Sequence, residues 1–525
     1  MKSGLDQAPP AHSESIRRRY GVTLIAQILR WALSFIVSAG LVPRRLGPVV
    51  YGNFNFLSNA SSTLRGFLDP SAQQAFFTFS SQDERSGPLT KLYSLTLLGQ
   101  MLIVFILIGF AAYFNKLQLF FPDQKVHQIM AITVLDWLLF MAISLQQLGD
   151  CKGLTVYPQL IGAVVAIVNA IALVGLALLH KLNLLTYVWM SLVSAVVWIS
   201  ALGYWLLVLH SDRCWDGKLI GHVNPLLRRW WRFASPLILL EYCTPVIAFL
   251  STYFIQIWYG SNEQGNYMLA LRWCSPALAF TSAGLMIFWR EIAHWTASGQ
   301  WDRAKEIHLQ FNHILFFMSF VLATWMSLGS SILIPAFVGQ QYAAAVPVLM
   351  IMAFYPVIQT SGHLSGASFK ATERTVVFRN LSIMISIADL FLTYFLLAKR
   401  SAIVPGMQMG AIGLALKMVV FGFFATEVYA WLDFRYYRLS YGRWLVERSF
   451  ILLLVGSLAI LTLHYLRQSL QSLGLKPLSS LALASTFYFA GVSIVAYVRP
   501  GIIGLTRQGI SKLLQEMIQK VYTGK

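Results

Sequence analysis

The chain has 525 residues, of which 57% are hydrophobic and only 12% are charged. Soluble domains carry about a quarter charged residues, so this composition excludes a soluble protein and indicates an integral membrane protein. The net charge of +19 would suit a nucleic-acid-binding protein, but the Lys and Arg residues lie in short loops between hydrophobic runs, where they orient helices and meet anionic lipid.

Fourteen hydrophobic segments follow one another along the chain, each long enough for about 20 residues of helix to cross a ~30 Å hydrocarbon core. Long unbroken apolar runs favour helices over a β-barrel, whose strands alternate apolar and polar residues. We therefore predict an all-α membrane protein. The predicted segments are 22–42, 51–72, 89–113, 127–148, 158–179, 184–207, 233–257, 267–289, 311–335, 343–367, 376–398, 409–432, 446–466 and 478–498.

Basic residues are sorted onto alternate loops. The N-terminal tail, every second loop and the C-terminal tail together hold roughly 27 of the 40 Lys and Arg residues, beginning with Arg17, Arg18 and Arg19. By the positive-inside rule this side is cytoplasmic, so both termini are predicted to lie in the cytoplasm. A wrong segment count would have scrambled the sorting, so the asymmetry also supports the count of fourteen.

The segments predict a two-bundle organisation. The opening tail is polar, with two adjacent prolines and several serines, and is expected to be disordered rather than to form a cleavable signal peptide. The predicted parts are a disordered tail 1–19, a six-helix bundle 20–207, a cytoplasmic linker 208–232, a second six-helix bundle 233–435, two additional helices 436–498 and a cytoplasmic tail 499–525.

The linker contains a basic and aromatic stretch, Leu226-Leu227-Arg228-Arg229-Trp230-Trp231-Arg232. Such a pattern is typical of an amphipathic piece lying among lipid headgroups. A simple anchored linker is the alternative interpretation.

The two halves share a motif at the same topological position. Gly47-Pro48-Val49-Val50-Tyr51-Gly52-Asn53-Phe54 follows the first segment, and Gly260-Ser261-Asn262-Glu263-Gln264-Gly265-Asn266-Tyr267 follows the seventh. Both read G-x4-G-N-aromatic. Internal repeats are common in transporters. We expect the glycines to adopt a positive φ at an outer turn and the aromatic residue to anchor the returning helix.

These residues resemble those of a known family. Leu46-Gly47-Pro48 with Tyr51-Gly52, Gly265-Asn266-Tyr267 followed by Ala270 and Arg272, and Phe337-Val338-Gly339-Gln340-Gln341-Tyr342 with Ala345 are similar to the polysaccharide transporters of the multidrug/oligosaccharidyl-lipid/polysaccharide exporter superfamily, which includes the O-antigen flippases. The resemblance covers residues 15–500. It implies two six-helix bundles in a V around a central cavity, two additional C-terminal helices, and alternating access that moves isoprenoid-pyrophosphate-linked oligosaccharides between leaflets.

Four basic residues fall inside predicted helices: Arg30, Arg65, Arg272 and Lys417. A charge at the bilayer centre costs roughly 2.5–3.5 kcal/mol on insertion scales, so these side chains should face a cavity or each other. We predict all four as substrate-binding cations of the cavity.

Arg30 is the strongest candidate among the four. It lies near the middle of the first segment with no acid three or four residues away, and Gln27 and Ser34 share its helical face. A guanidinium suits a pyrophosphate. The alternative is a structural pair with an acid of another helix.

The other three have stronger competing explanations. Arg272 and Lys417 either hold the ligand late in transport or extend outward to the interface. Asp69 lies at i+4 from Arg65, so a helical salt pair near the cytoplasmic end is the favoured explanation of both residues.

Acidic residues inside the segments are candidates for ion coupling. Asp136, Glu241, Asp389 and Glu427 either bind Na⁺ or carry protons, or neutralise a cation within the membrane. The four cysteines have no metal-ligand spacing, so we predict no disulfide, metal or other cofactor.

Two segments are rich in polar side chains. Segment 51–72 carries several Asn and Ser residues, and segment 343–367 carries Gln359, Thr360, Ser361, His363 and Ser365. These side chains either hydrogen-bond sugar hydroxyls or join helices through small polar contacts.

The favoured function is therefore a flippase of surface polysaccharide biosynthesis in a bacterial inner membrane, acting on a lipid-linked oligosaccharide such as an O-antigen precursor of lipopolysaccharide. Membrane lipid and the polysaccharide polymerase machinery are the expected partners, and nucleic acid is not. One alternative is a multidrug exporter of the same superfamily, although the two additional helices and Arg30 count against it. A membrane polymerase or ligase is a weaker alternative, because the outer loops are short and hold no acid/base pair.

Overall fold

The computed structural model describes residues 16–69, 72–82, 86–122, 124–216, 223–235 and 238–504. In these ranges the regular structure is entirely helical, which confirms the predicted all-α class. The predicted disordered tail 1–19 and the tail 499–525 lie mostly outside the described residues. We call the end of a helix that the charge pattern assigns to the cytoplasm its inner end.

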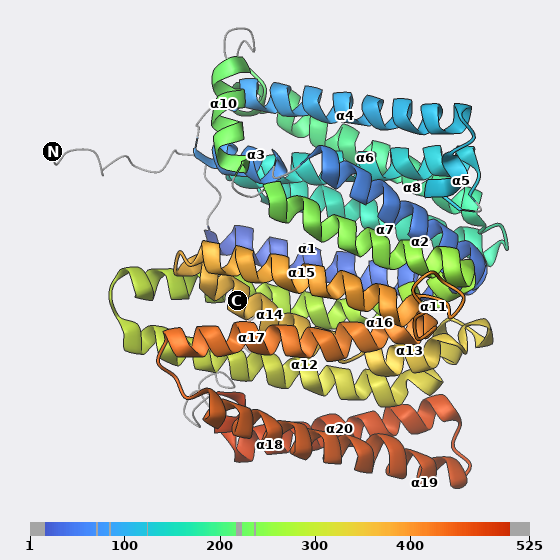
Figure 1. Cartoon of the computed structure of the whole chain (residues 1–525), viewed down its shortest axis with the longest axis vertical. Coiled ribbons are helices and arrows are strands. Elements are labelled where there is room, and N and C mark those ends of the chain that lie inside the picture. Colours follow the sequence, from blue (N-terminus) through green and yellow to red (C-terminus); the bar gives the residue numbers. More distant parts are fainter. Residues whose placement is uncertain are drawn as a thin grey trace. The chain divides into compact units, whose positions relative to one another are not determined.

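The chain divides into two units, Met1–Gln264 (unit 1) and Gly265–Lys525 (unit 2). The helices that begin in unit 1 are α1 (Ile16–Ser34), η1 (Phe35–Leu41), α2 (Val42–Leu68), α3 (Ala72–Gln82), α4 (Gly87–Tyr113), α5 (Leu117–Phe120), α6 (Val126–Cys151), α7 (Val156–Leu178), α8 (Leu184–Gly203), η2 (Tyr204–Val208), α9 (Ser211–Cys214), α10 (Val223–Ala234) and α11 (Ile238–Ala297) (Figure 1).

Unit 2 begins within α11 and continues to the last described residue. Its further helices are α12 (Trp301–Phe337), η3 (Gln340–Tyr342), α13 (Ala345–Met352), α14 (Tyr355–Ala371), α15 (Thr375–Leu397), α16 (Gly410–Leu416), η4 (Lys417–Phe421), α17 (Gly422–Tyr436), α18 (Tyr441–Ala459), η5 (Ile460–Leu466), α19 (Arg467–Ser472), α20 (Pro477–Val498) and η6 (Pro500–Ile503). The first part of α11 belongs to unit 1 because it packs there: Asn59 of α2 donates to Thr252 at 2.7 Å, and Phe249 stacks on Phe56.

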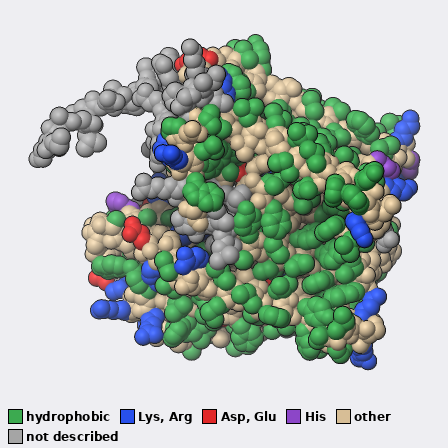
Figure 2. All heavy atoms as spheres, turned by 45° about the horizontal axis from the view of Figure 1, so that its top comes forward, with side chains coloured by type: hydrophobic (Ala, Val, Ile, Leu, Met, Phe, Trp, Pro, Cys, Tyr) green, Lys and Arg blue, Asp and Glu red, His purple; other side chains and the backbone are tan. Residues whose placement is uncertain are grey.

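Eleven helical runs among the described residues are long and apolar enough to span a membrane. One of them, Ile25–Leu68, holds the first two predicted segments, and α11 holds the seventh and eighth. Within the described ranges, each of the fourteen predicted segments is mostly helical. Hydrophobic side chains cover most of the face seen in Figure 2, and Lys and Arg gather towards its margins. This is the distribution that a multi-pass membrane protein requires.

The repeated motif forms the same sharp turn in each half. Gly47 has φ 76° and ψ 165°, and Gly260 has φ 81° and ψ −179°, a region of backbone space that is essentially restricted to glycine. The positive φ expected from the sequence is therefore present at both first glycines. Beyond the second turn, Ser261 donates to Asn53 of the first motif at 2.5 Å.

Replacing Gly260 by alanine should lower the stability of the protein by about 1–3 kcal/mol, because the new side chain is strained at this φ and ψ. An added Cβ would meet no atom within 4 Å, so the cost comes from the backbone alone. A lower melting temperature in detergent would show it, and Gly442→Ala, a helical glycine with equally open surroundings, is the matched control. Equal melting temperatures would contradict the prediction.

The predicted amphipathic stretch of the linker is the helix α10, which lies across the inner end of α4 in Figure 1. Trp230 is buried against the ring of Tyr93, while Trp231 is 67% exposed. Arg229 lies over the ring of Phe79 on α3. One edge of the apolar face of α10 thus packs against α3 and α4, and the other edge, with Trp231, is exposed.

The two C-terminal helices pack on α12 within unit 2. Tyr488 of α20 hydrogen-bonds Thr324 at 2.7 Å, and the indole N–H of Trp325 donates to Ser485 at 2.8 Å. Buried hydroxyl contacts of this kind fix the relative positions of membrane helices.

Candidate functional site

Arg30 of α1 is held by two neutral side chains. Its Nη1 donates to Oε1 of Gln146 on α6 at 2.9 Å, and its Nη2 donates to Oε1 of Gln159 on α7 at 2.6 Å. In the described part of unit 1 Arg30 forms no salt bridge, although the charge of Asp150 acts on it from a greater distance. The guanidinium is therefore positioned by neutral side chains and is not bound directly to a carboxylate.

A small cavity of about 120 Å³ adjoins this guanidinium. Its polar lining comes from Arg30, Ser34 and Ser38 of the first span and from Asn169 and Tyr187 of α7 and α8. A polar cavity of this size accommodates water or part of a polar ligand. Ser34, predicted to share a face with Arg30, does line this space, whereas Gln27 is not among the lining residues.

Glycine creates the room for the Arg30 side chain. A Cβ at Gly162 on α7 would come within 3.0 Å of Arg30 Nη1 and 3.3 Å of the Trp198 ring. The absence of a side chain at Gly162 thus lets the guanidinium reach Gln159 one turn before it.

π-helical turns accompany two of the predicted cations. The segment η1 begins at Phe35, just after the turn that carries Arg30, and η4 begins at Lys417 itself. π-Helical turns are rare and frequently mark functional sites.

Arg65 and Asp69 do not form the predicted helical salt pair. Arg65 Nε instead donates to Asp136 Oδ2 on α6 at 3.0 Å, and its guanidinium stacks on Phe140 at 3.8 Å. α2 ends at Leu68 and the backbone turns away at Asp69, so the i+4 geometry of a continuing helix is lost. Asp69 accepts a hydrogen bond from Tyr93.

Lys417 is buried and does not extend to the interface. Its Nζ lies 2.8 Å from Asp389 Oδ2 and 3.0 Å from Thr393 Oγ1. Arg272, in contrast, is half-buried in α11. The four predicted cations therefore divide between the units, Arg30 and Arg65 in unit 1 and Arg272 and Lys417 in unit 2.

Variants of the Lys417–Asp389 pair show whether Asp389 has a structural role or couples transport to an ion. Lys417→Met alone should destabilise the protein by about 3–5 kcal/mol, because it leaves a carboxylate unpaired, whereas Lys417→Met with Asp389→Leu should recover most of the loss. Melting temperatures measure this. If the recovered double variant also transports at the wild-type rate, Asp389 is not a coupling residue.

Glu427 pairs with Arg448, a cation that was not among the four predicted inside helices. Arg448 lies two turns inside α18 and is only 5% exposed. It pairs with Glu427 of α17, and Tyr441 donates to the second oxygen of Glu427 at 2.6 Å. The N-cap residue Ser440 is the sequence signal that would have started this helix early enough to bury Arg448. The side chain of Glu241 lies outside the described part.

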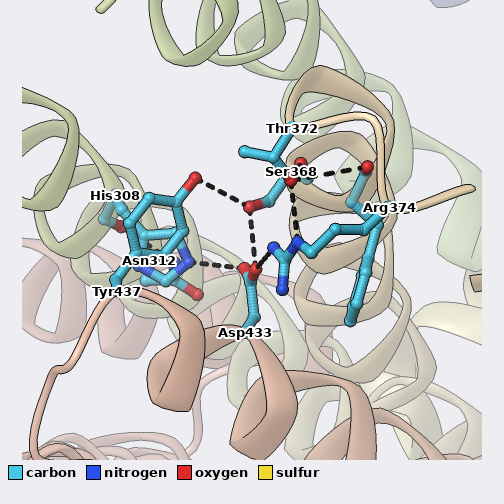
Figure 3. A network of polar contacts seen from close by, with 8 residues as sticks. His308, Asn312, Ser368, Thr372, Arg374, Asp433 and Tyr437 are labelled. Carbon is cyan, nitrogen blue, oxygen red and sulfur yellow. Dashed lines mark hydrogen bonds and ion pairs between the residues drawn. The ribbon is translucent and has the colours of Figure 1, made fainter. Parts of the chain in front are cut away.

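The inner end of unit 2 holds a polar network centred on the fully buried Asp433 (Figure 3). Asp433 of α17 accepts hydrogen bonds from His308 of α12 at 2.7 Å, Ser368 of α14 at 2.8 Å and Arg374 at 2.5 Å. The Tyr437 hydroxyl donates to Ser368 at 3.1 Å, and burial raises the pKa of this phenol. The network ties the inner ends of three helices together. No sequence spacing singled it out.

The polar residues of α14 fall into two sets. Thr360 and Ser361 are buried and contact other helices, as the helix-packing interpretation expects: Thr360 Oγ1 lies 3.3 Å from the Ser319 hydroxyl of α12, and Arg448 of α18 donates to Ser361 at 3.4 Å. Gln359 donates to exposed His363 at 2.8 Å, and exposed Lys370 lies over the rings of Trp289 and Phe378. Gln359, His363 and Lys370 share one stripe of α14, which we call the α14 polar stripe.

No group of three or more His, Cys, Asp or Glu side chains in the described ranges is placed to hold a metal ion. None of the four cysteines forms a disulfide in the structure described.

Solved structures resemble the chain over most of its length. A lipid II flippase, MurJ, in an inward closed conformation superposes with a TM-score of 0.63 at 12% identity, covering 92% of this chain and 99% of that chain. A multidrug resistance MATE family transporter gives 0.58 at 12% identity in its inward-facing conformation, covering 81% of this chain and 98% of that chain. Its outward-facing conformation gives 0.54 at 13%, covering 81% and 95%. The search of curated proteins found no match.

These likenesses show the fold: the chain has the all-helical, multi-pass architecture of these flippase and transporter structures. A family model described as polysaccharide biosynthesis protein matches residues 16–280, half of the chain. The chain belongs to this polysaccharide biosynthesis family, as its motifs predicted.

Proposed function

We propose that this protein is a flippase that moves an isoprenoid-pyrophosphate-linked oligosaccharide across a bacterial inner membrane for surface polysaccharide biosynthesis, with both termini in the cytoplasm. The observation that carries the proposal is Arg30, a guanidinium inside a membrane span that neutral glutamines hold beside a polar cavity. The related solved structure named a lipid II flippase supports a substrate of the same class.

A pyrophosphate headgroup matches the chemistry of this position. Two of the five N–H donors of Arg30 go to Gln146 and Gln159, which leaves donors for phosphate oxygens. In a span with little competing water, a charge-assisted pair is stronger than at the surface. Since the glutamines are neutral, they orient the guanidinium without competing for its charge.

The α14 polar stripe supplies a second surface of suitable chemistry on unit 2. Its imidazole and ammonium groups are exposed along a membrane span and its amide is half-buried, so contact of these groups with acyl chains would be costly. Hydrogen-bonding side chains flanked by Trp289 and Phe378 are suited to a sugar headgroup.

The pairing of acids with cations also favours a transporter of an anion. Asp136, Asp389 and Glu427 are each bound to a Lys or Arg, and so are not free to bind a cationic drug or to act as an acid/base pair. We therefore propose a transporter rather than an enzyme, with the lipid-linked glycan, membrane lipid and the polysaccharide polymerase machinery as partners.

The direct test uses purified protein in proteoliposomes that contain a lipid-linked oligosaccharide labelled in its glycan. Flipping is measured as loss of protection from a membrane-impermeant glycosidase, with protein-free liposomes as the control. Faster loss of protection than in the control is expected. A rate equal to the control, together with accumulation of a cationic dye in the same vesicles, would instead assign the protein to multidrug export.

A further inference from the structure

Asp69 is an acid of unit 1 that forms no salt bridge of its own within the described ranges. It ends α2, one residue beyond the span Ile25–Leu68. Its Oδ2 accepts a hydrogen bond from the Tyr93 hydroxyl of α4 at 3.2 Å. Its Oδ1 is buried and makes no well-formed hydrogen bond in the described part of the chain, although the backbone N–H groups of Ala72 and Gln73 at the start of α3 act on the carboxylate. A buried carboxylate oxygen in this state is costly unless the group takes up a proton.

The count of charges around Asp69 leads to the same conclusion. Arg65 is the neighbouring cation, and its Nε is committed to Asp136 at 3.0 Å while its guanidinium rests on Phe140. One cation thus stands between two carboxylates, Asp136 and Asp69. When two acids share one cation in a poorly solvated place, the acid with the weaker contact binds a proton first.

The other neighbours that the structure describes bring no second cation to Asp69. On α3, Gln73 donates to Gln147 of α6 at 3.0 Å, and Gln100 of α4 donates to the Leu68 carbonyl at 2.6 Å. On α10, Arg229 faces the ring of Phe79. Among the residues that the structure describes, the charged and titratable groups that face Asp69 are therefore Arg65 of α2, Tyr93 of α4 and, through Arg65, Asp136 of α6.

Burial raises the pKa of Asp69 to about 7, although the Tyr93 hydrogen bond, the charge of Arg65 and the backbone N–H groups of Gln73 and Ala72 act in the opposite direction. The carboxyl thus titrates near neutral pH in the folded protein. Its protonated form also has a donor to offer, and Tyr93 can then accept or donate.

We propose that Asp69, hydrogen-bonded by Tyr93, is a proton-binding site of unit 1, and that Arg65 is shared between Asp69 and Asp136 according to whether the proton is bound. Binding joins one proton from water to the Asp69 carboxylate and gives a neutral acid. With the proton bound, Arg65 is held by Asp136 alone. With the proton released, the Asp69 carboxylate draws Arg65 towards the inner end of α2. That this proton drives transport rests on the proposed function; that it binds at Asp69 does not.

The binding site is tested without transport by infrared difference spectroscopy of the purified full chain in nanodiscs. A carboxylic-acid band should disappear with a midpoint near pH 7 in the wild type and in Asp302→Asn, which removes a carboxylate that is 98% exposed. The band should be absent in Asp69→Asn, a variant that mimics the neutral form and should therefore fold. Its persistence in Asp69→Asn, or a wild-type midpoint near the ordinary value of about 4, would overturn the assignment.

Thermal stability gives a second readout. A folded-state pKa raised from 3.8 to about 7 means that the folded protein binds the proton more tightly than the unfolded chain, so stability is greatest in acid and falls as pH rises through this window. The wild type should lose more melting temperature between about pH 5 and about pH 8 than Asp69→Asn does. An equal loss would contradict the proposal.

The coupling role is tested in the proteoliposome assay across the same pH range. Wild-type flipping should depend on pH with a midpoint near 7, and Asp69→Asn should remove the dependence. If the wild type flips no lipid-linked oligosaccharide while the carboxyl band titrates, the proposed function fails and the proton site stands. If the wild type flips and Asp69→Asn keeps both the band and the pH dependence, the proton site fails.

Discussion

Replacing Arg30 by alanine should reduce flipping of a lipid-linked oligosaccharide by on the order of 100-fold, close to the rate of protein-free liposomes. The variant loses a charge-assisted pair with the pyrophosphate that is worth about 3 kcal/mol in a poorly solvated site. Folding should survive, because the partners left behind, Gln146 and Gln159, are neutral. Flipping rate and melting temperature, measured on the same preparation, separate the two effects.

Matched variants locate the effect in the guanidinium itself. Arg30→Lys keeps the charge but loses the fork geometry and should restore only part of the rate. Gly162→Val should imitate Arg30→Ala with Arg30 still present, since a side chain there displaces Nη1. Gly175→Val, on the same helix with open space around it, is the control. Normal flipping by Arg30→Ala would refute the assignment of the cation.

Replacing Asp433 by alanine should cause the largest loss of stability among single substitutions, about 3–5 kcal/mol. Asp433 is fully buried and accepts hydrogen bonds from His308, Ser368 and Arg374. Its removal leaves Arg374 without a counter-charge and two donors without an acceptor. The expected result is a much lower melting temperature in detergent and little folded protein from cells.

Graded variants test whether the network acts through Asp433. Ser368→Ala should cost only about 1 kcal/mol, because a neutral donor is lost while the ion pair with Arg374 remains. Asp302→Asn on the same unit removes an exposed carboxylate and should change little. If Asp433→Ala melts at the temperature of Asp302→Asn, the network does not stabilise unit 2.

The order of helices was accessible from sequence because hydrophobic length and loop charge act locally. The turns at Gly47 and Gly260 were accessible for the same reason, since a backbone conformation that only glycine adopts depends on the residue in place. The partner of Arg65, in contrast, could not be predicted from the sequence. Asp69 is four residues away and Asp136 is 71 away, and local spacing favours the nearer acid until the end of the helix is known.

The same limit applies to the candidate site. Sequence marked Arg30 as a cation without a local partner, but the glutamines that hold it come from α6 and α7, and no periodicity reveals such pairings. Arg448 was not predicted as a buried cation because it falls at the edge of the predicted segment 446–466, and its partner Glu427 comes from another helix. The helix begins at Tyr441, since a cap and a buried ion pair extend it beyond the apolar run.

The π-helical turn η1 changes the rotational register of the first span. A π-helical turn accommodates one more residue than an α-helical turn, and one residue of an α-helix corresponds to about 100° of rotation. Side chains before Phe35 and after Leu41 are thus turned relative to one another by an amount that no single helical wheel over the span represents. The face of the span that carries Arg30 therefore does not continue as the same face in the outer half of the span. The lipid-facing side chains of one half cannot be deduced from those of the other.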